Sequence, residues 1–174
     1  MFAHFKPQQL VKSEETYLLV PQRDLNVKIR NQIFDVKQKL KVNSDGLEQW
    51  LPILKVEFPM SQEAFKKIAA LLGLQGHPLG DSLSELDFIS AMGLESTISP
   101  VRLTKMREKY ELQGVAGEFT HLQIGKKNVF TIAFEHVDAK KIGQIRNHLA
   151  IEDLMNENYP QALKRLMGIV RGVS

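Results

Sequence analysis

Hydrophobic and polar residues alternate along two stretches of the chain, and this alternation predicts two groups of β-strands. Side chains at positions i and i+2 of an extended strand lie on the same face of a sheet. Alternation therefore indicates a strand with one buried face, as where Phe34, Val36 and Leu40 alternate with charged or polar neighbours. The first group is predicted at residues 16–21, 25–30, 33–40 and 51–58, and the second at residues 101–112, 115–124 and 129–135.

The hydrophobic spacing becomes helical between and after these groups. Ser61 is predicted to cap a helix that contains Phe65, Ile68 and Leu72. Further helices are predicted at residues 82–92, after Asp138, and from Pro160, where proline suits a first helical turn. About eight strands with four helices predict an α+β fold that is dominated by an antiparallel sheet or barrel.

Composition restricts the class of protein. With 174 residues and 43% hydrophobic content, one domain over residues 1–174 is expected, with residues 1–13 as an N-terminal extension. A formal charge of +3 is too small to favour nucleic acid by itself, and the lack of cysteine excludes disulfides, thiolate zinc sites and a cysteine nucleophile. No signal-peptide pattern and no membrane-length apolar run is present, so a cytoplasmic protein is expected.

Basic residues recur two positions apart on several predicted strands. Lys28 and Arg30 form one such pair, Lys37 and Lys39 another, and Lys105 and Arg107 a third. On a strand, each pair shares a face, and strands that close around a hollow would make that hollow a site for a multiply charged anion. The alternative is a solvated sheet face, which we favour for Lys39 and Lys55.

Two acidic residues near the basic strands also have alternative interpretations. Glu118 and Glu135 lie on adjacent predicted strands, where carboxylates could hold a divalent metal. They could equally form cross-strand ion pairs with the same lysines.

The ordered set of strand motifs resembles the CYTH superfamily, also called triphosphate tunnel metalloenzymes. The segments that carry the resemblance are Thr16-Tyr-Leu-Leu, Asn26-Val-Lys-Ile-Arg30, Asp35-Val-Lys-Gln-Lys-Leu40, Lys105-Met-Arg-Glu-Lys-Tyr110 and Thr131-Ile-Ala-Phe-Glu135. The resemblance spans residues 14–170. It implies an eight-stranded antiparallel barrel, closed or nearly closed into a tunnel, that binds a triphosphate together with Mg²⁺ or Mn²⁺.

The resemblance also assigns roles to particular residues. The residues that match the family's substrate-binding positions are Lys28, Arg30, Lys37, Lys105 and Arg107. Its catalytic and metal-binding positions fall on Glu15, Glu118 and Glu135.

The chain departs from the family pattern mainly in its carboxylates. The family's opening E-x-E-x-K motif reads Glu15-x-Tyr17-x-Leu19, and the later acidic pairs read Glu118-x-Thr120 and Ala133-x-Glu135. Each acidic pair has lost one member, so the basic half of the site is kept and the metal half is depleted.

Three functions follow from this pattern. The first is a basic tunnel that binds a triphosphate or another phosphorylated polyanion, such as tripolyphosphate, a nucleotide or thiamine triphosphate, and hydrolyses it with a divalent metal. The second is a catalytically inactive CYTH-like binding or interaction module with a degenerate metal site. The third is an interaction protein whose barrel interior is apolar. Nucleic acid ranks low as a partner because no aromatic residues are interleaved with the basic ones.

Overall fold

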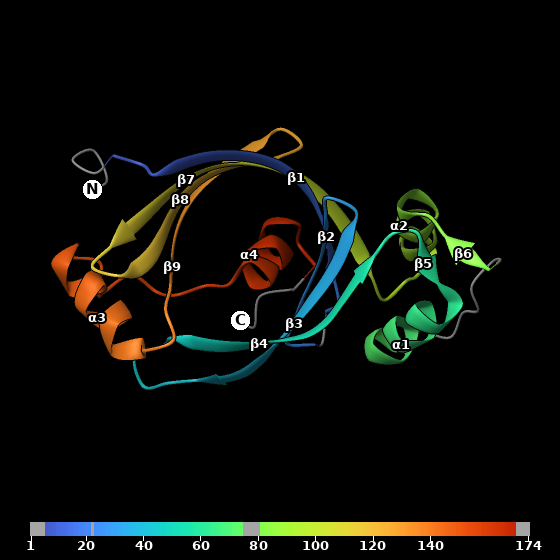
Figure 1. Ribbon diagram of the computed structural model, residues 1–174, viewed down its shortest axis with the longest axis horizontal. Helices are drawn as coiled ribbons and strands as arrows, with labels where there is room; N and C mark the ends of the chain where they lie inside the picture. Colours follow the sequence, from blue (N-terminus) through green and yellow to red (C-terminus); the bar gives the residue numbers. More distant parts are fainter. Residues whose placement is uncertain (1–5, 22, 75–80, 170–174) are drawn as a thin grey trace. The chain divides into compact units, whose positions relative to one another are not determined.

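The main element of the computed structural model is a seven-stranded antiparallel sheet, and the structure describes residues 6–21, 23–74 and 81–169 (Figure 1). The sheet order is β4-β3-β2-β1-β7-β8-β9. Its strands are β1 (Gln9–Leu19), β2 (Leu25–Arg30), β3 (Ile33–Val42), β4 (Glu48–Glu57), β7 (Ser99–Leu112), β8 (Val115–Ile124) and β9 (Lys127–Glu135). The predicted α+β class is confirmed, with seven strands in the main sheet of the described residues where eight were expected.

Four helices and a short two-stranded sheet complete the described structure. The helices are α1 (Gln62–Leu72), α2 (Glu85–Leu94), α3 (Ala139–His148) and α4 (Tyr159–Leu166), and the small sheet pairs β5 (Met60–Ser61) with β6 (Ser82–Leu83), on either side of α1 in the chain. Ser61 caps α1 as predicted, since its hydroxyl accepts a hydrogen bond from the Ala64 amide. No described helix combines the length and apolar character needed to cross a membrane.

The first strand begins earlier than the sequence predicts. β1 starts at Gln9, so the predicted extension at residues 1–13 overlaps the strand, and residues 1–5 lie outside the described part. The first half of β1 is mostly polar and exposed, which hides the strand from a search for buried alternation. The Gln8 amide donates to the Lys109 carbonyl at 2.8 Å, so backbone pairing beside β7 fixes this segment.

The chain divides into two compact units. Unit 1 contains residues 1–14, 41–48 and 103–156, and unit 2 contains residues 15–40, 49–102 and 157–174. β1 and β7 each supply residues to both units. Each unit has a buried hydrophobic cluster of its own.

In unit 2, one face of the β2–β3 pair is the wall of a hydrophobic core. Val27, Ile29, Phe34 and Val36 alternate along these strands and are almost fully buried. Phe88 of α2 packs edge-on against Phe34, with ring centroids 5.4 Å apart. Burying a side chain of this size contributes about 1.5–3 kcal/mol, so this core holds α1 and α2 on that face.

The opposite face of the same strands receives α4. Tyr159 at the start of α4 contacts Tyr17 of β1, and their ring centroids are 6.1 Å apart. The Lys164 ammonium donates to the carbonyl oxygens of Pro21 and Arg23 at 3.2 and 3.5 Å. These two hydrogen bonds fasten α4 to the turn between β1 and β2. Burial lowers the pKa of Lys164, and the Asp24 carboxylate opposes this effect.

In unit 1, α3 packs on one end of the β7–β8 pair. Tyr110, Leu112, Val115 and Ile145 form the buried cluster there. Burial along β7 therefore changes face: odd-numbered residues are buried up to Arg107, and even-numbered residues are buried beyond it. The pairing of β7 with β8 is regular from Thr104 to Leu112, so what covers each face, and not a bulge in this pair, causes the change.

Candidate anion-binding site

A basic pocket of about 290 Å³ lies on β2, β3 and β4 of unit 2. Its lining residues are Lys28, Arg30, Asn31, Ile33, Asp35, Lys37, Pro52 and Lys55. Four of these side chains are cationic and one is a carboxylate. The pocket therefore presents a strong excess of positive charge in a small concave space.

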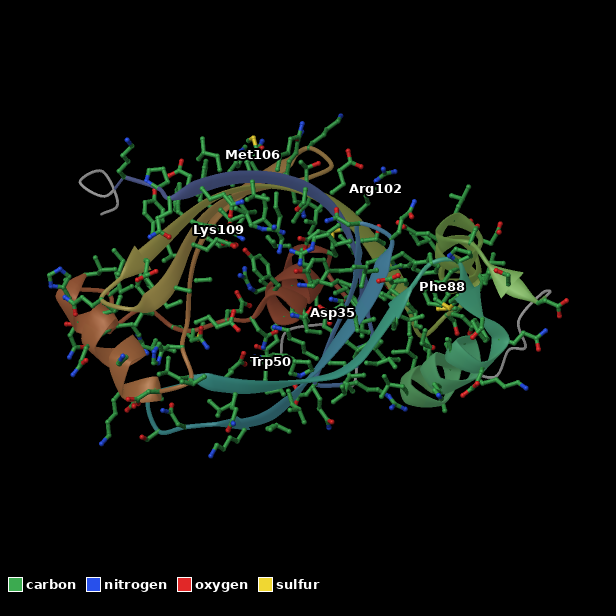
Figure 2. The ribbon with its side chains drawn as sticks, in the orientation of Figure 1. Asp35, Trp50, Phe88, Arg102, Met106 and Lys109 are labelled. Carbon is green, nitrogen blue, oxygen red and sulfur yellow. The ribbon has the colours of Figure 1, made fainter. Side chains whose placement is uncertain are left out.

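Strand register explains why the pocket gathers these side chains. Lys28 pairs with Asp35, and the neighbouring pairs join Asn26 to Lys37 and Arg30 to Ile33. Residues directly opposite each other in an antiparallel pair share a face, as do residues two apart on one strand. The pocket face is thus the reverse of the hydrophobic core face, and Figure 2 shows Asp35 on the side of β3 away from Phe88.

Lys55 is exposed, as the sequence favours, and it also lines this pocket. The Asn43 amide bonds the Leu47 carbonyl, and the Phe58 amide bonds the Gln32 carbonyl, so the β3–β4 hairpin keeps one register at both ends. Counting through that register places Lys55 opposite Asp35. The turn at residues 43–46 is recognisable in the sequence, and counting from it would have found this lysine.

Two ion pairs organise the cations of the pocket. The Lys28 ammonium lies 3.8 Å from the Asp35 carboxylate. The Arg30 guanidinium lies 3.4 Å from Glu15, whose side chain is fully buried while that of Arg30 is 40% exposed. A buried carboxylate therefore orients an arginine that remains open to the pocket.

Unit 1 holds a second arginine–carboxylate pair with the opposite burial. Arg107 Nε lies 3.6 Å from Glu118 Oε1, and the Arg107 side chain is 5% exposed against 26% for Glu118. Arg107 Nη2 also donates to Ser13 Oγ at 3.0 Å, and Thr120 Oγ1 donates to Glu118 Oε1 at 2.7 Å. Lys105 is buried on the same face of β7, while Lys109 and Met106 point to opposite sides of that strand (Figure 2).

Glu135 takes no part in the hydrogen bonds of Arg107 and Glu118. It is exposed at the end of β9 and pairs with Ala116, whereas Glu118 pairs with Ala133. The two glutamates are thus diagonal neighbours on one face, a spacing of roughly 7–8 Å between backbones. The cross-strand ion pair considered for Glu118 is present, with Arg107 as its partner rather than a lysine.

The structure thus divides the predicted site residues between the units. Lys28, Arg30 and Lys37 meet in the pocket of unit 2, and Glu15 supports Arg30. Unit 1 contains the other four, which are Lys105, Arg107, Glu118 and Glu135.

The candidate carboxylates do not form a donor set that suits a divalent metal. Among the described residues, no three His, Asp or Glu side chains come together in a metal-binding group. Glu15 and Glu118 each lie against an arginine, which already supplies the positive charge that a metal would bring. Binding of Mg²⁺ or Mn²⁺ stays a prediction of the family resemblance.

Comparisons with known proteins give only distant similarity. No family model and no curated protein matches the chain. A Bacillus halodurans protein described as a "putative adenylate cyclase" aligns with a TM-score of 0.47 and 15% identity, over 91% of this chain and 85% of its own. The PH1819 protein of Pyrococcus horikoshii aligns with a TM-score of 0.45 and 14% identity, over 93% and 88% of the two chains. At such low scores, the functional interpretation rests on the residues of this chain.

Proposed function

We propose that the basic pocket of unit 2 binds a small phosphorylated polyanion, with tripolyphosphate as the simplest example. The observation that supports this proposal is the convergence of Lys28, Arg30, Lys37 and Lys55 on one pocket that a single carboxylate also lines. A triphosphate carries about four negative charges, and removing it from water requires cations in contact with it. Arginine offers a planar fork to phosphate oxygens, and lysine offers mobile point charges.

The size and lining of the pocket favour a compact ligand over a nucleic acid. Its volume of about 290 Å³ is at the small end of ligand sites. Its apolar lining residues are Ile33 and Pro52, so no aromatic ring of the lining stacks on a base. The charged phosphate chain is therefore the part of a ligand that this pocket recognises.

The proposal is of binding rather than hydrolysis. Glu15 and Glu118, the two most buried catalytic candidates, are each held by an arginine, which leaves them poorly placed to activate water. This favours the binding module among the functions that the sequence suggests. The closed tunnel, the ligand contacts of Lys105 and Arg107, and metal-dependent hydrolysis remain predictions of the CYTH resemblance.

Isothermal titration calorimetry with tripolyphosphate tests the proposal through two double variants that each remove two lysines. Lys37→Ala/Lys55→Ala removes pocket cations that have no ion-pair partner among the described residues, so the fold should stay intact. Lys66→Ala/Lys67→Ala removes the same charge from the exposed surface of α1. We expect the pocket variant to bind at least about tenfold more weakly and the α1 variant to bind like wild type.

Two results would overturn the proposal: no binding by the wild-type protein, or equal weakening by both double variants. Phosphate release from tripolyphosphate, ATP and thiamine triphosphate, measured with Mg²⁺ and with Mn²⁺, separates binding from hydrolysis. Turnover by the wild-type protein above the rate measured without protein would show that the chain is an enzyme.

A further inference from the structure

The pocket of unit 2 offers very few oxygen ligands to a metal ion. Mg²⁺ prefers about six oxygen ligands and is usually held in proteins by one or two carboxylates together with phosphate oxygens and waters. Asp35 is the one carboxylate that lines the pocket. Its oxygen lies 3.8 Å from the Lys28 ammonium, so a metal on Asp35 would lie beside a cation.

The carboxylate that contacts Arg30 is closed to the pocket. Glu15 has a fully buried side chain, and the Arg30 guanidinium that contacts it is the group that lines the pocket. A metal ion in the pocket would meet Arg30 before it met Glu15. Arginine stays charged at every accessible pH, so the repulsion between it and a metal ion is permanent.

A metal complex of a polyphosphate is also a poorer partner for this lining than the free anion. A divalent ion neutralises about two of the charges on a triphosphate and occupies oxygen atoms that Arg30 and the lysines need. The pocket has four cations to place on those oxygens and one carboxylate to place on the metal. Every part of this comparison favours the metal-free ligand.

We infer that the pocket selects the metal-free form of its polyanion, so that Mg²⁺ competes with the protein for the ligand. This inference rests on the proposed function and specifies the form of ligand that it takes. The inference distinguishes this pocket from a site in which a metal bridges ligand and protein. Such a site would bind its ligand more tightly when Mg²⁺ is added.

The test is calorimetric titration of the full chain with tripolyphosphate in two buffers of equal ionic strength, one with EDTA and one with enough Mg²⁺ to saturate the ligand. We expect the apparent Kd to rise at least about tenfold in the Mg²⁺ buffer. Equal or tighter binding with Mg²⁺ would overturn the inference while the proposed function stands. Absence of binding in both buffers would instead overturn the proposed function.

An Asp35→Asn variant provides a second readout in the same two buffers. The substitution removes the carboxylate that competes with the ligand for Lys28, so binding in EDTA should tighten by about threefold or more. The weakening by Mg²⁺ should persist in this variant. The inference would be overturned if Mg²⁺ tightened binding by the wild-type protein but not by Asp35→Asn. That result would show that Asp35 holds the metal.

Discussion

Arg30 of unit 2 and Arg107 of unit 1 begin from the same local pattern and reach opposite environments. Each follows a lysine two positions earlier on a strand, and each lies 3.4–3.6 Å from a glutamate. In the first pair the carboxylate is buried and the arginine is open, whereas in the second the arginine is buried and the carboxylate is partly open. The first pair presents a cation to a pocket, and the second fastens β7 to β8 and to Ser13.

The difference shows that spacing alone does not decide what a charged strand pair does. Removing one member of a buried ion pair is costly because it leaves the other charge without compensation. The buried member that would remain is Glu15 in unit 2 and Arg107 in unit 1, and a partly exposed partner such as Arg30 weakens its pair through solvent screening.

The largest expected effect is on the pair in unit 1. Glu118→Ala leaves the buried Arg107 guanidinium without its carboxylate, and we expect the free energy of unfolding to fall by about 3–5 kcal/mol. Urea denaturation followed by circular dichroism measures this loss. Glu118→Gln serves as the matched variant, since it removes the charge and keeps an acceptor for Thr120. A loss below about 1 kcal/mol would contradict a structural role for Arg107.

A smaller loss is expected for the pair in unit 2, because Arg30 is 40% exposed and water screens its charge. Arg30→Met removes the guanidinium that contacts the buried Glu15 carboxylate, and we expect about 3 kcal/mol of destabilisation at neutral pH. Urea denaturation of both variants at pH 7 compares them directly. A loss in Arg30→Met clearly larger than that in Glu118→Ala would break the contrast between the pairs.

The smallest expected effect is a loss of stability at alkaline pH that depends on Tyr110, which is buried on the other face of β7. Burial and the hydrogen bond that Tyr110 donates to Glu108 raise the pKa of Tyr110 to about 12. The unfolded chain loses this proton near pH 10 and the folded chain holds it, so stability falls as the pH rises from 10 towards 12. By pH 11 we expect a loss of roughly 1–1.5 kcal/mol.

Tyr110→Phe provides the matched control for this alkaline loss. The variant cannot ionise at this position, so the part of the loss that is due to Tyr110 should disappear from denaturation curves measured between pH 9 and pH 11. An unchanged alkaline slope would show that the phenol of Tyr110 is not protected by its position under α3.

The sequence predicts the pocket better than it predicts its surroundings. Alternation at Lys28, Arg30 and Lys37 gives the strand face correctly, because side-chain direction on a strand follows from the backbone geometry. Alternation does not reveal what covers a face, which is why it treats Arg30 and Arg107 alike although their burial differs. That information depends on contacts between segments distant in sequence, such as the one between Arg107 and Ser13.

The remaining differences have similar causes. The start of β1 escapes prediction because its first residues are mostly exposed and mix polar and apolar side chains without alternation, and the backbone hydrogen bond from Gln8 to Lys109 leaves no mark in hydropathy. Lys55 is exposed as expected, and what the sequence does not predict is that it also lines the pocket. Its place in the pocket depends on the register of the β3–β4 hairpin, which the turn determines.

Asp35 gives the pocket an internal counterion. In the ligand-free protein its carboxylate partly neutralises Lys28 and limits the repulsion among cations that the strands bring together. Under the proposed function, an arriving polyanion would take over Lys28 from Asp35, so binding would exchange one negative group for another. Such an exchange would lower the affinity and raise the dissociation rate of the ligand.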